Sequence, residues 1–288
     1  MADLRFHGLP EYSSLGGTIA GTVLVDSKKP VEAAQLQLRF RGVEHTRMTV
    51  QAGKQRTVIE EVRPFHEESL LFDPVAFGAG DSVHRASFSV TVPPDGPPSL
   101  ATAPMPPVRG RFTQHPDGAY VEYTLEATLD IPWWPDPVAV VAVPVYSPRR
   151  VLGTAPPLRA PSLSGRPAIT LDVDQSQLLP GSVVEGSFQV FNEKRSRLRS
   201  ITVWLARQVE YVVRGRNRRS VGPRFEAVVP IDSSDPARAG RFSITLENRS
   251  DTTGPWQGAL YRTYWKLGAH LDIGFGFDID VEEPLVPT

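Results

Sequence analysis

Apolar and polar residues alternate along much of the chain. In "LQLRFRG" (36–42) and "FGFDIDVEE" (275–283), every second side chain is apolar, which is the pattern of a β-strand with one buried and one exposed face. The 28 prolines interrupt almost every segment that is long enough to form a helix. The pattern therefore predicts an all-β protein.

The same strand pattern occurs twice. Gly16 and Gly21 lie five residues apart, and Gly181 and Gly186 repeat that spacing at a shift of 165 residues. Further on, the alternating segments 123–131 and 265–273 match at a shift of 142. Between these motifs, "FSVTV" (88–92) corresponds to "FSITL" (242–246). We therefore predict two copies of one β module.

The repeated glycines are expected to have structural roles. Gly16 and Gly181 lie where a turn leads into a strand, a place that favours a positive φ. Gly21 and Gly186 lie inside the strand, where glycine marks a bulge or a close backbone approach. The alternative is that all four are small residues without a special role.

The chain is long enough for two domains. We predict an N-terminal sandwich at residues 1–150, a linker rich in Pro and Arg at 151–166, and a C-terminal sandwich at 167–288. Each module has a size that can bury its own core. Strands with one apolar face favour two sheets packed face to face.

In their order and duplication, these motifs resemble the arrestin family, whose relatives include the Vps26-type retromer subunit and the bacterial Spo0M-type sporulation-control proteins. The resemblance extends from about residue 10 to 284. It implies two tandem immunoglobulin-like β-sandwich domains (arrestin-like N and C domains) and a non-enzymatic adaptor or scaffold. No PP dipeptide continues into the PPxY motif with which α-arrestins recruit ubiquitin ligases, so a compact bacterial member fits better.

Composition excludes several classes of site. The chain has no cysteine, which rules out disulfides and thiolate chemistry, and its formal net charge of −1 gives no specific nucleic-acid signal. The first residues lack the pattern of a signal peptide, and the most apolar run, 137–146, is shorter than a membrane-spanning helix. We expect a cytoplasmic protein.

Catalytic and metal-binding patterns are also missing from the sequence. No nucleophile elbow, P-loop or dinucleotide fingerprint occurs. His66 beside two glutamates fits a solvated loop better than a metal site, and the D-x-D pairs at 172–174 and 278–280 fit the polar face of a sandwich better than a calcium site. We expect no enzyme activity, no cofactor and no metal.

The second module carries the one uneven distribution of charge. Between residues 194 and 219 there are nine basic residues and a single acid, Glu210. They gather in two clusters near opposite ends of one predicted strand, too far apart to hold one small anion. The candidate anion- or partner-binding residues are Lys194, Arg195, Arg197, Arg199, Arg214, Arg216, Arg218 and Arg219. The alternative is that these side chains only protect strand edges from aggregation.

Two adjacent tryptophans, Trp133 and Trp134, stand between prolines after a long predicted strand. Adjacent residues of an extended chain face opposite sides, so one indole should pack on the core and the other should be more exposed. The exposed indole is a candidate contact for a partner or a membrane interface. Filling the gap at the end of the sandwich is the simpler interpretation.

The leading functional hypothesis is an adaptor that binds another protein, either through an exposed strand edge or through the basic clusters. For those clusters, an acidic or phosphorylated peptide and an anionic membrane surface both remain open. Two alternatives come from other classes of protein: a carbohydrate- or ligand-binding β-sandwich module, and a self-assembling structural subunit that forms a homo-oligomer.

Overall fold

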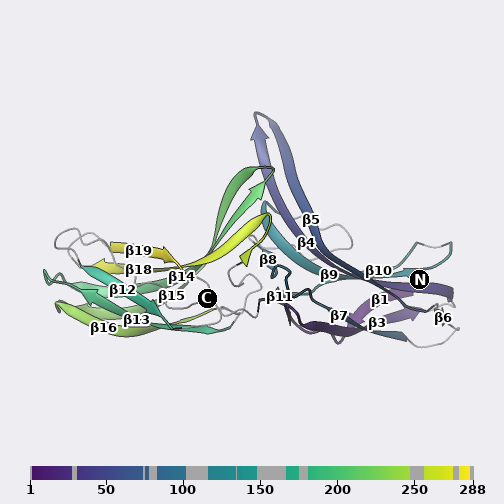
Figure 1. Ribbon diagram of the computed structural model, residues 1–288, viewed down its shortest axis with the longest axis horizontal. Coiled ribbons are helices and arrows are strands. Elements are labelled where there is room, and N and C mark those ends of the chain that lie inside the picture. Colours follow the sequence, from purple (N-terminus) through teal and green to yellow (C-terminus); the bar gives the residue numbers. More distant parts are fainter. Residues whose placement is uncertain are drawn as a thin grey trace. The chain divides into compact units, whose positions relative to one another are not determined.

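The computed structural model describes residues 2–27, 31–73, 75–77, 83–101, 116–133, 135–147, 167–174, 181–246, 256–274 and 279–285. These residues form strands, turns and loops without a helix, so the all-β prediction is confirmed (Figure 1). The predicted linker at 151–166, Trp134 and the first half of the expected last strand lie outside the described residues.

The chain divides into two compact units, the first comprising Met1–Ser147 with Val212–Arg216. One sheet of this unit has the strand order β1 (Ala2–His7), β3 (Thr18–Ser27), β7 (His84–Thr91). The other has the order β10 (Val138–Ala142), β9 (Gly118–Asp130), β4 (Val31–Ala52), β5 (Gln55–Leu71). Short strands add to these sheets: β6 (Val75–Phe77) pairs with β4, β8 (Leu100–Ala101) pairs with β9, and β2 (Ser13–Ser14) pairs with β11 (Val145–Tyr146).

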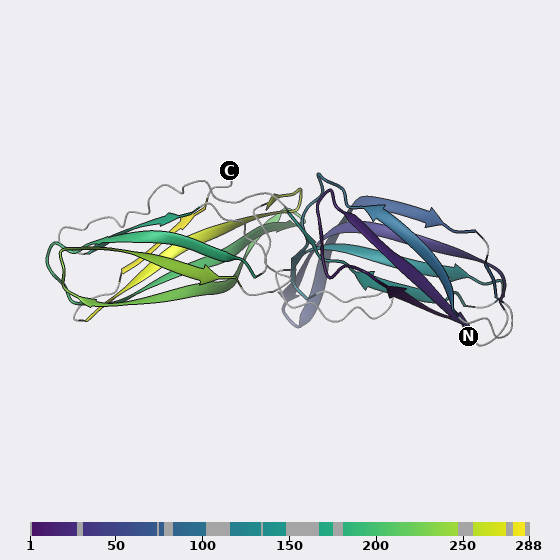
Figure 2. The same cartoon turned by 90° about the horizontal axis from the view of Figure 1, so that it is seen from below.

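The second unit comprises Pro148–Tyr211 and Asn217–Thr288. Its smaller sheet has the order β12 (Ala168–Val173), β13 (Val183–Phe191), β16 (Ala237–Thr245). Its larger sheet has the order β15 (Arg216–Ser233), β14 (Leu198–Val213), β18 (Tyr261–Ile273), β17 (Trp256–Gln257), and β19 (Ile279–Pro284) pairs with β18. Figure 1 shows the strands of each unit arranged in two layers, and Figure 2 gives the view from below, onto the sheets.

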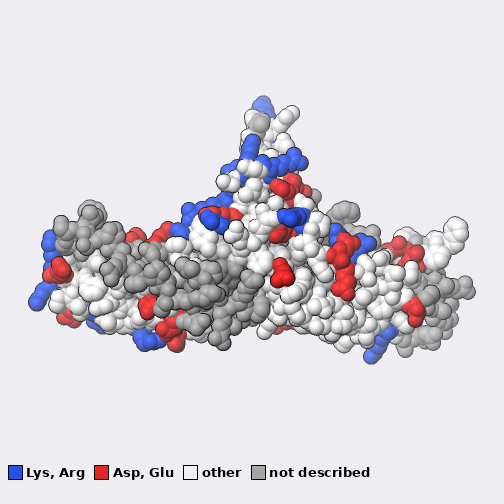
Figure 3. Space-filling model, viewed as in Figure 1, with Lys and Arg blue, Asp and Glu red and all other residues white. Residues whose placement is uncertain are grey.

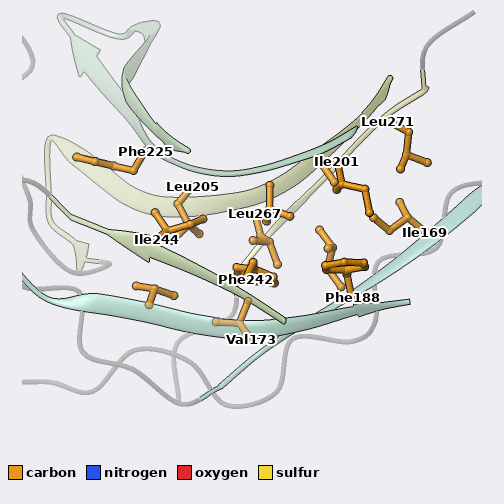
Figure 4. Close-up of a cluster of buried hydrophobic side chains, with 14 of the residues drawn as sticks. Ile169, Val173, Phe188, Ile201, Leu205, Phe225, Phe242, Ile244, Leu267 and Leu271 are labelled. Carbon is orange, nitrogen blue, oxygen red and sulfur yellow. The ribbon is translucent and has the colours of Figure 1, made fainter. Parts of the chain in front are cut away.

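Each unit buries apolar side chains between its layers. In the second unit, Phe188 and Phe242 of the smaller sheet meet Ile201, Leu205 and Leu267 of the larger sheet (Figure 4). The alternation along the strands produces this core, because every second side chain points between the sheets.

In the first unit, the Tyr123 side chain is buried and stacks on Phe40 with ring centroids 5.8 Å apart. Its hydroxyl donates a hydrogen bond to the Pro97 carbonyl oxygen at 2.8 Å, which satisfies the buried phenol. Burial, together with the nearby Glu44 carboxylate, raises the pKa of Tyr123 above its ordinary value.

The register of the two larger sheets follows the repeat seen in the sequence. In the first unit Leu36 of β4 pairs with Leu129 of β9, and in the second unit Ile201 of β14 pairs with Leu271 of β18. Leu36 and Ile201 are related by the shift of 165, and Leu129 and Leu271 are related by the shift of 142. The two sequence shifts therefore describe one strand arrangement built twice.

The smaller sheets repeat as well, and they explain the glycines. Gly21 pairs with Phe88, and Gly186 pairs with Phe242, without a bulge at either pair. A Cβ on Gly21 would lie 3.1 Å from Phe88 Cζ, and one on Gly186 would lie 2.5 Å from Phe242 Cζ. The predicted bulge is therefore absent at both pairs, and a cross-strand ring approaches both glycines. The predicted close backbone approach is found at Gly186, where a Cβ would lie 2.3 Å from the Asp172 carbonyl oxygen.

The glycines at the strand starts behave as predicted. Gly16 has a φ of 73° and Gly181 a φ of 77°, both in the left-handed region. The prediction of an all-β fold with two tandem sandwiches is confirmed. Independent folding of residues 1–150 and 167–288 stays a prediction.

Candidate partner-binding surface

The first basic cluster begins at the turn between β13 and β14. Lys194 and Arg195 are exposed on this turn, where the Arg195 backbone has a φ of 53°. Buried Asn192 closes the turn: its side-chain amide donates to the Ser196 carbonyl oxygen at 2.7 Å, and its Oδ1 accepts from the Ser196 N–H at 2.9 Å. The Arg195 N–H donates to the Asn192 carbonyl oxygen at 2.9 Å. This turn is thus held by its own hydrogen bonds and presents two cations to solvent.

The remainder of this cluster is tied to the end of β18. The Arg197 carbonyl oxygen accepts a hydrogen bond from the Gly274 N–H at 2.8 Å. The Arg199 guanidinium donates to the Gly274 carbonyl oxygen at 3.3 Å and lies 4.0 Å from an Asp272 carboxylate oxygen. Arg199 therefore already has partners within the fold.

The second cluster surrounds the turn between β14 and β15. Arg214 and Gly215 have φ values of 45° and 74°, as in a type I′ turn, whose twist matches that of the strands it joins. Arg214 and Arg216 are exposed at this end of the hairpin. Arg219 donates a hydrogen bond to Gln208 Oε1 on the neighbouring strand, so its role includes a contact within the sheet. The two clusters lie at opposite ends of β14, as the sequence predicted.

Other charges on the larger sheet are paired across strands. Arg262 of β18 contacts Glu210 of β14 at 2.6 Å, Lys266 contacts Glu282 of β19, and His270 Nδ1 lies 2.9 Å from Asp280 Oδ1. Some exposed basic side chains differ from these, because they make no side-chain ion pair with any residue that the structure describes. At the two turns they are Lys194, Arg195, Arg214 and Arg216, and on β15 Arg224 also has no ion pair but lies over the Trp204 ring, 4.4 Å from its centroid. Figure 3 shows Lys and Arg atoms along the hairpin of β4 and β5 as well, so exposed basic side chains are not confined to the ends of β14.

Glu210, the single acid of the basic stretch, belongs to a hydrogen-bonded group on the sheet surface. Tyr264 Oη donates to Glu210 Oε1 at 2.9 Å, and Arg262 Nε donates to Glu210 Oε2 at 2.7 Å. Hydrogen bonds from Tyr264 and Arg262 hold the pKa of the Glu210 carboxyl below its usual value. Partial burial, with the hydrogen bond to Glu210, raises the pKa of Tyr264.

Sequence reasoning missed two features of this region. Asn192, which organises the first cluster, is signalled only by an Asn directly after a strand, a pattern typical of side-chain-closed turns. Arg207, the ninth basic residue of the stretch, is 3% exposed and therefore takes no part in a surface cluster. Which cations remain unpaired depends on neighbouring strands and left no signal in the sequence.

The structure describes Trp133 but not Trp134. Trp133 lies in the connection between β9 and β10, where its side chain is fully exposed and its φ is 70°. The interpretation that it fills a gap at the end of the sandwich is therefore wrong for Trp133, because its indole packs on no core. Whether Trp134 packs inward lies outside the described residues.

The residues considered for metal binding serve other contacts. Asp174 pairs with Arg241 at 2.5 Å, and Asp280 pairs with His270. His66 Nε2 lies 4.0 Å from Glu68 Oε2. Within the part of the chain that the structure describes, no group of three or more potential ligands among His, Asp and Glu converges. The same residues contain no helix long and apolar enough to span a bilayer.

Two consecutive sandwiches with one strand order define a repeated all-β protein. A family model described as the arrestin (or S-antigen) N-terminal domain matches residues 6–149, half of the chain. The chain therefore belongs to the arrestin family, and the predicted resemblance is confirmed. Proteins of this family generally bind other proteins and are generally not enzymes. A search of curated proteins found no match.

Proposed function

We propose that this arrestin-like protein is a non-enzymatic adaptor that binds an acidic or phosphorylated segment of a partner protein through the basic ends of β14. The observation that supports the proposal is the set of four exposed cations, Lys194, Arg195, Arg214 and Arg216, without ion pairs among the described residues. Paired cations on the same sheet would have to break an existing contact before binding an anion. These four cations have no side-chain ion pair to break among the described residues, although the Glu61 carboxylate accepts a hydrogen bond from the Arg214 backbone N–H at 3.0 Å.

The chemistry of the two clusters suits phosphate and carboxylate groups. A guanidinium presents its N–H donors in a planar fork that matches both groups bidentately, and hydrogen bonds to ionised partners are stronger than neutral ones. Arg195 and Arg214 both stand on turns with positive φ, so short loops rather than flexible tails present them. Two separate clusters favour an extended partner with several anionic groups.

The edge position of β15 adds a second means of contact. Among the strands that the structure describes, β15 pairs only with β14, and it begins at Arg216. An extended segment that pairs with this free edge would gain main-chain hydrogen bonds and pass the basic turn. The alternative carbohydrate-binding function has less support, because the large exposed aromatics among the described residues, Tyr12, Trp133 and Phe191, lie on three separate segments of the chain.

The test measures the binding of a fluorescent acidic peptide that carries phosphoserines, by fluorescence anisotropy. The cluster variant replaces four residues: Lys194→Gln, Arg195→Gln, Arg214→Gln and Arg216→Gln. A matched control with the same loss of charge replaces four exposed arginines of the first unit: Arg5→Gln, Arg56→Gln, Arg63→Gln and Arg85→Gln. We expect the cluster variant to bind at least about tenfold more weakly and the control to bind nearly as the wild type does.

Two further measurements make the result specific. Raising salt from about 50 to about 300 mM should weaken binding of the wild type much more than that of the cluster variant, because screening acts on exposed charges. Vesicles of phosphatidylcholine and phosphatidylserine are offered in parallel. Three results would contradict the proposal: equal losses of peptide affinity in the cluster and control variants, no peptide binding, or binding to vesicles alone. Assembly into a defined oligomer without peptide binding, detected by light scattering, would favour a structural subunit.

A further inference from the structure

Trp133 is the most exposed large apolar residue that the structure describes, with a relative accessibility of 101%. The next most exposed, Leu71, reaches 64%. A fully exposed indole does not stabilise the fold, because the hydrophobic effect contributes to stability only when the large apolar surface of the ring is buried. Its exposure therefore has no explanation in the packing of the first unit.

The backbone at Trp133 is also unfavourable for the residue it carries. Its φ of 70° lies in the left-handed region, where glycine or asparagine is favoured and a bulky side chain is an outlier. Such outliers persist when the surrounding structure imposes them, and they gather at functional sites. Exposure and backbone conformation are two independent observations on one residue.

The connection that carries Trp133 is short and held at its base. The Leu129 N–H donates to the Pro137 carbonyl oxygen at 3.1 Å, and the Ile131 N–H donates to Asp136 Oδ1 at 3.4 Å. Pro132 precedes the tryptophan, and its ring fixes φ at that position. The indole is thus presented on a restrained turn, which reduces the entropy that binding would cost.

The charged residues in the segment that carries the indole have a single sign. Asp130 and Asp136 are exposed, and within the described residues neither forms an ion pair. Residues 130–137 contain no Lys, Arg or His. Two carboxylates beside an apolar anchor would be repelled by an anionic membrane, and they would attract a surface with the opposite charge.

We propose that Trp133 is the anchor of a second docking site, on the first unit, for a partner protein with an apolar pocket bordered by basic side chains. The indole fills the pocket, and Asp130 and Asp136 meet the basic border. Tryptophan is enriched among the residues that dominate binding energy at protein interfaces, and charges at the rim steer association. A protein occupant also agrees with a family whose members generally bind proteins. The site shares no residue with the basic clusters at the ends of β14.

The experiment uses the full chain with the photoreactive residue p-benzoylphenylalanine in place of Trp133. A matched control carries it in place of Tyr12, another exposed aromatic of the same unit. Both are irradiated in a lysate of the cells that produce the protein, and the cross-linked residue on any captured protein is mapped by mass spectrometry. We expect a product specific to position 133 whose cross-link falls among apolar residues flanked by Lys or Arg.

Affinity for the purified captured protein is then measured by calorimetry. Trp133→Gly should bind at least about 30-fold more weakly yet keep the thermal midpoint of the wild type, because glycine suits the positive φ. Trp133→Phe should retain part of the affinity. The double variant Asp130→Asn with Asp136→Asn, which keeps a hydrogen-bond acceptor at 136, should bind several-fold more weakly and lose most of its salt dependence.

Several results would overturn this site. One is that the variant labelled at position 133 captures no more protein than the variant labelled at position 12. Another is a cross-link to a second copy of the chain or to an acidic surface, and a third is unchanged affinity of Trp133→Gly for the captured protein. Quenching of tryptophan fluorescence by brominated phosphatidylcholine vesicles, lost in Trp133→Phe, would assign the indole to lipid instead. The four-residue variant of the basic clusters should still cross-link at position 133, so failure of one site is distinguishable from failure of the other.

Discussion

Gly21 in the first unit and Gly186 in the second occupy the same place in the repeated sandwich, yet they are enclosed differently. A Cβ on Gly21 would meet only side chains, with Leu9 Cδ2 nearest at 2.9 Å, and Leu9 lies outside the strands. A Cβ on Gly186 would meet the Asp172 carbonyl oxygen of β12 at 2.3 Å. Both units therefore have the glycine and its cross-strand ring, but a side chain at the glycine position would have less space in the second unit than in the first.

The larger sheets show a stronger divergence at equivalent positions. His45 of β4 pairs with Tyr120 of β9, and the residues related to them by the two shifts are Glu210 and Arg262. The first pair brings two rings together with centroids 6.1 Å apart, and the second forms an ion pair. One strand register thus accepts unrelated side-chain chemistry, because main-chain hydrogen bonds and the buried faces maintain it.

The largest expected effect tests whether the two cores are separate. Tyr123 and Trp265, related by the shift of 142, are each buried in the core of their own unit. Tyr123→Ala and Trp265→Ala should each lower the free energy of unfolding of one unit by about 3–5 kcal/mol, through lost burial and the cavity left behind. Scanning calorimetry should show each variant moving a different transition. A single transition that both variants shift equally would mean one merged core.

The glycine comparison gives an intermediate effect. Gly186→Ala should destabilise the second unit by about 3 kcal/mol, because the new methyl group meets a backbone oxygen that cannot move without disturbing β12. Gly21→Ala should cost the first unit only about 1 kcal/mol, since the Leu9 side chain can turn away. Denaturant titration followed by circular dichroism measures both. Equal losses of stability in the two variants would show that the cross-strand ring, and not the Asp172 carbonyl oxygen, limits the space for a side chain.

The smallest effect concerns the ion pair that only the second unit carries. Because the folded-state pKa of Glu210 is lowered, its stabilising contribution is fully present above the ordinary glutamate value of 4.5 and is lost as pH falls below it. Glu210→Gln should therefore be less stable than the wild type at pH 7, and the difference should shrink toward pH 3. Thermal midpoints measured across this range test the sign. His45→Gln in the first unit serves as the control and should not reproduce this loss below pH 4.5.

Much of the frame could be predicted from the sequence by itself. The alternation at 36–42 and 123–131 predicted strands that the structure confirms as parts of β4 and β9. The paired shifts of 165 and 142 predicted the second unit from the first, and Gly16 and Gly181 predicted turns of positive φ. These are local properties, because strand periodicity and the conformational freedom of glycine depend on a residue and its near neighbours.

The surface was decided only by the tertiary structure. In the sequence, eight basic residues form two similar clusters. In the structure, Arg199 contacts Asp272 of β18 and the Gly274 carbonyl oxygen just beyond the end of that strand. Lys194 and Arg216 have no such partner among the described residues. Likewise, the sequence identified Trp133 and Trp134 as candidate contacts but did not show that the Trp133 side chain is exposed. Whether a charge is paired or an indole is buried depends on side chains brought across from strands distant in the chain, and their register is set when the sheets assemble.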